Sequence, residues 1–421
     1  MFEWSETDLM IRDAAREFID KEIRPHLDEL EHGDLPPYDI ARKLFAQFGI
    51  DAMAEEAVTK MLERRRAKEA ALADGTEPAA KSGGKKGGAN PLAAQASMGV
   101  MLLSEIAGVS LGTVAAVGVS LGLGAATILS RGTLAQKERW LPDLVTLKKV
   151  AAWAITEPDS GSDAFGGMKT SVRRDGEDYI LNGQKTFITN GPFADVIVVY
   201  AKLDDGSGTD RRDRKVLTFV LDKGMEGLTQ GRPFRKMGMH SSPTGELFFD
   251  DVRVSRDRLL GETEDHHGGD GRDSARSAFV SERVGCAVLA MGIINECHRL
   301  CVDYAKNRRL WGQEIGRFQL IQLKLARMEI ARLNVQNMVF NVLEGAAAGR
   351  LPGLAEASAM KLYATETATD VAMEAVQLFG GNGYMAEYRV EQLARDAKSL
   401  MIYAGSNEIQ VTHVAKGLLG Y

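Results

Sequence analysis

The chain has 421 residues, of which 44% are hydrophobic and 26% charged, and its formal net charge at pH 7 is -6. This length exceeds one ordinary hydrophobic core and predicts two or three packed units, while the composition excludes a disordered or fibrous protein. With a pI near 5.8 the chain has no general positive field for nucleic acid or an anionic membrane, which favours small-molecule partners.

Residues 1–150 are predicted to form a helical domain. Ser5 is expected to cap a helix from Glu6 through Phe18, whose apolar residues follow helical spacing. The stretch from Ile106 to Ser130 carries no charge and is long enough to cross a bilayer. Its Gly, Ala and Ser content and its lack of aromatic ends favour a buried pair of helices, so no membrane span is expected.

Within this domain, residues 66–93 are expected to form a mobile insert. Their Gly, Ser, Pro and Lys residues cannot bury enough apolar surface to order the segment. The lysines could contact a phosphorylated or acidic partner, although a solvated loop is the preferred interpretation.

Residues 151–262 are predicted to form a middle β domain, because short β-branched and aromatic runs such as Val196–Tyr200, Val216–Leu221 and Leu247–Phe249 alternate with turn residues. Helical periodicity returns over residues 263–421. The fold class is therefore α+β, in the order helices, sheet, helices. No internal repeat and no glycine-rich dinucleotide-binding motif is present.

The cysteines Cys286, Cys297 and Cys301 are too few and too clustered for a disulfide framework, which indicates a reducing compartment. Cys297, His298 and Cys301 lack a second ligand pair at metal-binding spacing, so packing is the preferred interpretation and no metal is expected. The start of the chain lacks the basic and apolar parts of a signal peptide. A cytoplasmic location is therefore expected.

Five polar or glycine-rich segments occur together, and each is unspecific alone: Thr156–Asp163, Gly183–Asn190, Asn307–Arg309, Gln377–Tyr384 and Arg395–Lys398. In this order and spacing they resemble the acyl-CoA dehydrogenase family, from about residue 100 to the C-terminus and less closely before it. The resemblance implies a C-terminal four-helix bundle, a homotetramer built as a pair of dimers, and FAD held between the β domain and the bundle.

The implied reaction is α,β-dehydrogenation of an acyl-CoA thioester to the trans-2-enoyl-CoA, in fatty acid or branched-chain metabolism. The resemblance names an electron-transfer flavoprotein as the acceptor. Three alternatives stay open: a non-catalytic partner subunit of the same fold, an acyl-CoA oxidase, or a dehydrogenase acting on an acyl group carried by a protein. The length and branching of the acyl chain are not predicted.

The resemblance also implies the cofactor-binding residues, which are Trp153, Ile155, Thr156, Ser162, Phe187, Thr189, Arg308, Gln319, Gln377, Gly380, Gly381, Ser406 and Glu408. The hydroxyls of Thr156 and Thr189 are expected to face the isoalloxazine ring, where a hydrogen bond near N5 stabilises hydride acceptance. Phe187 or Trp153 is expected to pack on that ring.

Two further cofactor contacts are implied at a distance from the ring. Arg308 and Gln319 match positions that reach the FAD pyrophosphate of the adjacent subunit, where a guanidinium can make bidentate phosphate contacts. Gly380 and Gly381, together with Gly383, would let the backbone pass close to the cofactor.

The family mechanism needs a carboxylate base, and the sequence departs from the commonest family pattern at that point. Ala404 stands where Glu usually precedes the Gly of a segment like Ile402–Glu408, and a methyl group cannot take a proton. Phe279–Val284 resembles the segment in isovaleryl-CoA and long-chain acyl-CoA dehydrogenases where a Glu serves as base. Glu282 is therefore the expected base, although a carboxylate in a helix's first turn has a purely structural explanation in the macrodipole.

Substrate contacts follow from the same resemblance. The thioester carbonyl is expected between the flavin ribityl hydroxyl and the backbone N–H of Ala404, beside Gly405. Arg283 matches a position that contacts the CoA moiety, and Ser162 matches one near the bound thioester. A glycine-rich stretch, which contains Gly118, Gly122 and Gly124, either lines a roomy tail pocket or allows close helix packing.

Overall fold

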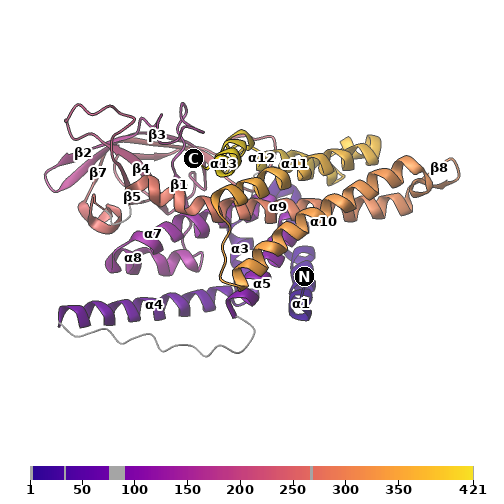
Figure 1. Cartoon of the computed structure of the whole chain (residues 1–421), viewed down its shortest axis with the longest axis horizontal. Helices are drawn as coiled ribbons and strands as arrows, with labels where there is room; N and C mark the ends of the chain where they lie inside the picture. The colour runs from indigo at the N-terminus through magenta and orange to yellow at the C-terminus, as the bar shows by residue number, and fades with distance from the viewer. Residues whose placement is uncertain (1–2, 33–34, 75–90, 266–268, 421) are drawn as a thin grey trace.

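We describe the chain from a computed structural model, over residues 3–32, 35–74, 91–265 and 269–420. A seven-stranded sheet lies at one end of an elongated molecule and long helices extend from it to the other end (Figure 1). The N-terminal helices run beneath both parts. The order of helices, sheet and helices predicted from the sequence is confirmed.

The N-terminal part is helical, and its first helix begins where the sequence predicts. The Ser5 side chain accepts the Asp8 N–H at 3.1 Å, and the Asp8 carboxylate accepts the Ser5 N–H at 2.9 Å, so the two residues form a capping box. The α-helices of this part are α1 (Glu6–Phe18), α2 (Leu27–His32), α3 (Tyr38–Gln47), α4 (Ile50–Ala73), α5 (Pro91–Ala107), α6 (Leu111–Gly118), α7 (Ala126–Arg131) and α8 (Leu134–Val145).

Two expectations for this part need correction. The predicted insert does not begin at residue 66, because α4 continues to Ala73 through a run of good helix formers; residues 75–90 of that insert lie outside the described part of the chain. The uncharged stretch is not a pair of helices either. Leu111–Arg131 is one helical run with a π-helical segment, η3 (Val119–Ala125), between α6 and α7.

The glycines of that run divide between the two interpretations left open above. A Cβ on Gly124 would lie 2.5 Å from the Ala151 Cβ, so this glycine allows helix and strand to pack closely. A Cβ on Gly118 or Gly122 would meet no atom within 4 Å. Of these three glycines, only Gly124 is therefore required by packing.

The sheet has the order β1-β4-β2-β3-β7-β6, with β5 also paired to β4. Its strands are β1 (Ala151–Ala154), β2 (Ser171–Asp175), β3 (Asp178–Thr189), β4 (Val196–Leu203), β5 (Val216–Asp222), β6 (Leu228–Gln230) and β7 (Thr244–Val254). Strand β4 is buried along its whole length, which suits the apolar run Val196–Ala201 that makes up most of it.

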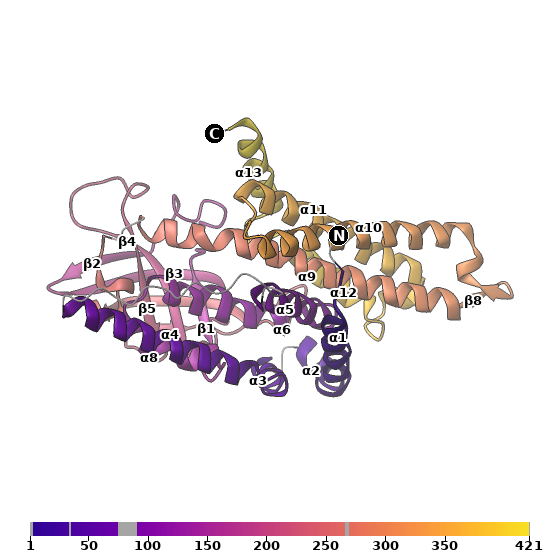
Figure 2. The ribbon, with the colours of Figure 1, turned by 60° about the horizontal axis from the view of Figure 1, so that its bottom comes forward.

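The C-terminal part is a bundle built around one long helix. Its helices are α9 (Gly271–Asn307), α10 (Gln319–Ala347), α11 (Leu354–Phe379), α12 (Val390–Leu400) and α13 (Asn407–Leu419), and a short hairpin of β8 (Arg309–Leu310) and β9 (Gln313–Glu314) joins α9 to α10. Both views place α9 and α10 side by side, with the hairpin at the end far from the sheet (Figures 1 and 2).

Helix α9 begins well before Glu282. The segment from Phe279 does not open a helix, because α9 begins eight residues earlier, at Gly271, where Asp270 forms a capping box with Asp273. Glu282 therefore lies roughly 17 Å along the helix axis from the first residue of α9, in the fourth turn. The macrodipole acts mainly in the first turn, so it does not explain this carboxylate.

Two helical stretches, Leu111–Arg131 and Gly271–Asn307, are long and apolar enough to cross a bilayer by length and composition. Buried core helices of globular proteins meet the same test. In these two stretches 61% and 53% of the most apolar window is buried inside the molecule.

Candidate active site

The ends of strands β1 and β3 meet at one edge of the sheet and bring two predicted segments together. The Thr186 N–H donates to the Thr156 carbonyl at 2.9 Å, so the chain after β1 lies beside the end of β3. Thr156 and Thr189 are half-buried, and their hydroxyls make no hydrogen bond within the part of the chain that the structure describes. Both hydroxyls are therefore available to a ligand.

Phe187 lies in a bulge of β3, where the register with β7 shifts between Lys185 and Ile188. Its φ is 56°, which is costly for a bulky residue, and its side chain is 67% exposed. Bulges next to active sites re-aim side chains. An exposed phenylalanine held in this backbone conformation gives a flat ring system a surface to pack on.

A buried ion pair, which the sequence argument did not assign, holds this loop in place. Lys185 Nζ lies 2.8 Å from Glu157 Oε1 and donates to the Ile155 carbonyl at 3.1 Å. The Glu157 carboxylate also accepts the N–H groups of Lys169 and Thr170. Both residues belong to motifs quoted above, but only the structure shows that they contact each other.

The indole of Trp153 links the sheet to helix α9. Its Nε1–H donates to the Tyr200 hydroxyl at 3.1 Å, and it packs in the same apolar cluster as Phe279. The Phe279 ring in turn carries the Arg283 guanidinium, with 5.5 Å between Cζ and the ring centroid. These contacts place the turn of α9 that carries Glu282 close to the edge where β1 ends.

Glu282 is half-buried and forms no hydrogen bond or ion pair with another described residue. Burial raises the pKa of its carboxyl to about 7, against the nearby positive charges of Arg283 and Lys361, which lower it. A pKa close to neutral suits a general base, which must take up a proton near the working pH.

The segment that carries Ala404 is a tight turn between α12 and α13. Ala404 and Gly405 are consecutive left-handed residues, with φ of 57° and 78°. The Ala404 N–H donates to no group in the described ranges, whereas its carbonyl accepts Gln410 Nε2 at 3.1 Å. A backbone donor without a partner is what a ligand oxygen needs.

Arg283 connects this turn with Glu282, its neighbour in sequence. The arginine is 2% exposed, Nη1 donates to Ser358 Oγ at 3.1 Å, and a Cβ on Gly405 would lie 3.7 Å from Nη2. Its Nε is buried without a partner in the described chain. The guanidinium thus faces the 404–405 turn rather than solvent.

Ser406 and Glu408 lie at the start of α13, as the N-cap and in the first turn. Backbone and Ser406 hydrogen bonding lowers the pKa of the Glu408 carboxyl, which is exposed. Ser162 is exposed in the loop after β1. The structure gives none of these three side chains a contact with Glu282.

The remaining predicted cofactor residues form a separate group at the far end of the bundle (Figure 1). Arg308 ends α9 and Gln319 starts α10, and both are exposed. Gly380 and Gly381, just after the exposed Gln377, lie nearby, because Asn382 Nδ2 donates to the hydroxyl of Tyr304, one turn before Arg308. About 38 Å of helix separates Glu282 from this end.

This distant group also has free surface for a ligand. The side chains of Arg308, Gln319 and Gln377 make no hydrogen bond or ion pair across the described ranges. A Cβ on Gly380 or Gly381 would meet no atom within 4 Å, whereas one on Gly383 would lie 2.3 Å from the Val376 carbonyl oxygen. Gly383 is therefore required by internal packing, whereas Gly380 and Gly381 face open space.

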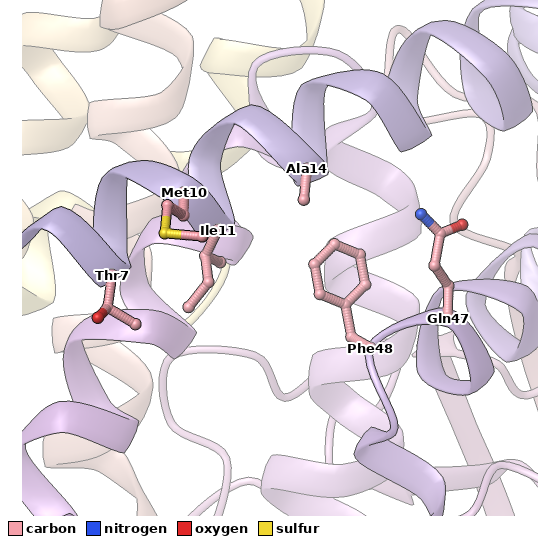
Figure 3. Close-up of a pocket in the computed structure, with 6 residues that line it drawn as sticks. All are labelled: Thr7, Met10, Ile11, Ala14, Gln47 and Phe48. Carbon is pink, nitrogen blue, oxygen red and sulfur yellow. The ribbon is translucent and has the colours of Figure 1, made fainter.

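An apolar hollow of about 350 Å³ lies elsewhere, between α1 and the end of α3 (Figure 3). Its lining residues are Thr7, Met10, Ile11, Ala14, Gln47 and Phe48. It contains no titratable side chain and none of the predicted site residues. Across residues 3–32, 35–74, 91–265 and 269–420, no group of three or more His, Cys, Asp or Glu could hold a metal ion.

Sequence comparison matches three domain families along the chain. They are described as the N-terminal, middle and C-terminal domains of acyl-CoA dehydrogenase and match residues 83–148, 152–252 and 269–419. A 3-(aryl)acrylate reductase from Clostridium sporogenes is 34% identical over 97% of this chain and 98% of its own length. A caffeyl-CoA reductase-Etf complex subunit from Acetobacterium woodii is 33% identical over 99% of both chains.

Among solved structures, butyryl-CoA dehydrogenase from Megasphaera elsdenii superposes on the whole chain with a TM-score of 0.79 at 31% identity, and all of that chain is covered. The glutaryl-CoA dehydrogenase of Mycobacterium smegmatis superposes with a TM-score of 0.81 at 27% identity, over 99% of this chain and 96% of that one.

Proposed function

This chain belongs to the acyl-CoA dehydrogenase family, and on that premise we propose that Glu282 is the base with which it removes the α proton of an acyl-CoA thioester. One observation carries this proposal. Burial raises the pKa of Glu282 to about 7, and the charge of Lys361, whose Nζ donates to the Gly405 carbonyl at 2.9 Å, acts on the same carboxyl.

The family is FAD-dependent, and a bound FAD would supply the acceptor for the hydride that leaves the β carbon of the substrate. The residues present fit such a cofactor. Thr156 and Thr189 offer free hydroxyls beside the exposed ring of Phe187, and Arg308 offers an unpaired guanidinium suited to a phosphate.

The chain's own groups then divide the work at the substrate. The free N–H of Ala404 is available to the thioester oxygen and stabilises the negative charge that develops there as the α proton leaves. Glu282 takes that proton. Trp153 and Phe279 pack against the same apolar cluster, which limits access of water to the carboxylate and keeps it desolvated and basic enough to react near neutral pH.

Two subunits are needed to complete the cofactor site in this proposal. Arg308 and Gln319 flank the β8–β9 hairpin, which lies at the opposite end of the molecule from β1 and β3 (Figures 1 and 2). Because about 38 Å of helix separates that end from Glu282, one FAD does not reach both groups within a single chain. A second copy that supplies the distant group to the sheet edge of the first resolves this. We therefore propose a homodimeric unit, within the homotetramer expected from the family.

An electron-transfer flavoprotein is the proposed redox partner, supported by the A. woodii relative, which is a subunit of a reductase-Etf complex. Two of the relatives are reductases by name, which favours a second candidate function, reduction of an enoyl substrate. In that direction protonated Glu282 returns a proton to the α carbon. The same site serves both directions.

The test is anaerobic mixing of the purified protein with short, branched, long and aromatic acyl-CoAs while flavin absorbance is followed. We expect a yellow protein with close to one FAD per chain and bleaching by at least one class of acyl-CoA. The dithionite-reduced protein mixed with enoyl-CoAs tests the opposite direction. A protein that folds with FAD present but retains none contradicts the proposal.

A further inference from the structure

Lys361 of α11 is a lysine with no exposed surface in the core of the C-terminal bundle. No carboxylate lies within ion-pair distance of it in the described chain. Its Nζ instead donates to the Gly405 carbonyl at 2.9 Å and to Asn407 Oδ1 at 2.8 Å. A buried ammonium is costly unless its hydrogen bonds serve the fold or the site, so these two acceptors indicate its purpose.

Both acceptors belong to the turn that presents the Ala404 N–H. Ala404 is left-handed without being glycine, a conformation that persists only when its surroundings determine it. Gln410 Nε2 donates to the carbonyls of Ala404 and Gly405, and Lys361 supplies the second donor to Gly405. Thr365 Oγ1 joins Lys361 on Asn407 Oδ1 at 3.2 Å. Lys361 and Thr365 of helix α11 thus hold the 404–407 turn in place.

The same lysine also acts on the base through its charge. The charged or titratable groups around it are Glu282, Arg283 and Cys286 of α9 and Glu408 of α13. Burial lowers the pKa of Lys361 to about 8, and its positive charge favours the ionised form of Glu282. Ser358, one turn earlier on α11, accepts Arg283 Nη1 and keeps α9 in register with this arrangement.

We propose that Lys361 is a positioning residue, which holds the Ala404 N–H toward the thioester oxygen by fixing the 404–407 turn and supports the ionised Glu282 with its charge. This inference rests on the proposed function for its catalytic part. The fixing of the turn does not depend on the substrate and can be tested separately.

Three variants separate the two contributions. Lys361→Met keeps the length of the side chain but removes the donors and the charge, and Lys361→Gln keeps a donor without the charge. Lys137→Met is the matched control, since Lys137 is also buried but lies on α8, outside the site. The first readout is amide hydrogen exchange over residues 401–411 of the FAD-loaded protein without substrate. The second is the pH dependence of anaerobic flavin reduction.

For Lys361→Met we expect exchange in 401–411 to rise about tenfold or more, flavin reduction to slow about tenfold to a hundredfold, and the rate profile to move to higher pH. Lys361→Gln should restore part of the protection but keep the shifted profile, and Lys137→Met should change neither. Unchanged exchange and an unchanged profile in Lys361→Met would overturn the proposal. If Lys361→Met does not fold, Lys361→Gln decides. Amide exchange and a pH–rate profile equal to those of the wild type in Lys361→Gln would contradict both the fixing of the turn and the support of the ionised Glu282. If no acyl-CoA bleaches the wild type and no enoyl-CoA reoxidises the dithionite-reduced wild type, the proposed function is refuted. Amide exchange still decides the role of Lys361 in the turn.

Discussion

Glu157 Oε1 lies 2.8 Å from Lys185 Nζ in an ion pair whose side chains are 3% and 0% exposed. The pair joins the loop after β1 to strand β3, so it sets where Thr156 and Phe187 lie relative to each other. Burial lowers the pKa of Lys185 to about 8. Although burial alone would raise it, the pKa of Glu157 is lowered by Lys185 and by hydrogen bonds from Thr170 and Lys169.

We predict that Lys185→Met destabilises the protein and weakens FAD retention, because it leaves Glu157 as an uncompensated buried charge. Removing one partner of such a pair costs about 3 to 5 kcal/mol. Asp159→Asn is the control, since it removes the exposed pair with Lys169 in the same loop, which is worth at most about 1 kcal/mol. Urea unfolding and FAD content measure both effects, and equal losses in the two variants would contradict the anchoring role.

Arg308→Ala should weaken FAD retention and the oligomer together, because its side chain has no partner within the described chain and is proposed to reach a cofactor held by another subunit. Loss of one charge-assisted contact is worth about 1.5 to 3 kcal/mol. Arg317→Ala removes an exposed arginine of the same end, paired with Glu314, and should change neither. FAD titration measures the affinity for FAD, and sedimentation velocity measures the assembly state. If both are unchanged in Arg308→Ala, the proposed contact between subunits is ruled out.

The sequence predicts much of this fold for physical reasons that are local. The Ser5 cap, the uncharged core segment and the β-branched strands are readable because propensity and periodicity act over neighbouring residues. The start of α9 is hard to predict, since its capping residues Asp270 and Asp273 lie in a polar stretch that also has the composition of a loop. The end of α4 is hard to predict for a different reason. The helix formers that continue it to Ala73 are followed directly by a stretch whose composition is typical of disorder, so no residue type marks the boundary.

The site was predicted less completely, because its supporting contacts join distant parts of the chain. Glu282 and Ala404 follow from a pattern, but Ser358, Lys361 and Gln410 become relevant only when α9, α11 and α13 meet. One signal was present in the sequence. Lys361 occupies a core position of the helical repeat formed by Ala357, Ala364 and Ala368, where a lysine requires an explanation.

The raised pKa of Glu282 predicts opposite effects of pH on rate and on stability. The base must be ionised, so flavin reduction should increase through pH 7. Because the carboxyl pKa is raised in the folded state, the folded protein keeps this proton to higher pH than the unfolded chain does. The group's contribution to stability is therefore present below about pH 4.5 and is lost as the pH rises to 7.

Glu282→Gln removes the cost of burying an ionised carboxylate. It should therefore increase the free energy of unfolding at pH 8 by about 1 to 3 kcal/mol, and by less at pH 5. Urea unfolding at both pH values, with Glu356→Gln as an exposed control on α11, measures the difference. Equal changes in the free energy of unfolding at pH 5 and pH 8 would show that folding does not raise the pKa of the Glu282 carboxyl.

The most direct test of the account is the rate of anaerobic flavin bleaching in Glu282→Gln, measured with the best substrate of the panel. The amide keeps the size of the side chain but cannot take the α proton, so FAD and acyl-CoA should still bind. The rate should fall by roughly two to four orders of magnitude, the usual contribution of a positioned general base. Bleaching at the wild-type rate would contradict the assignment of Glu282 as the base.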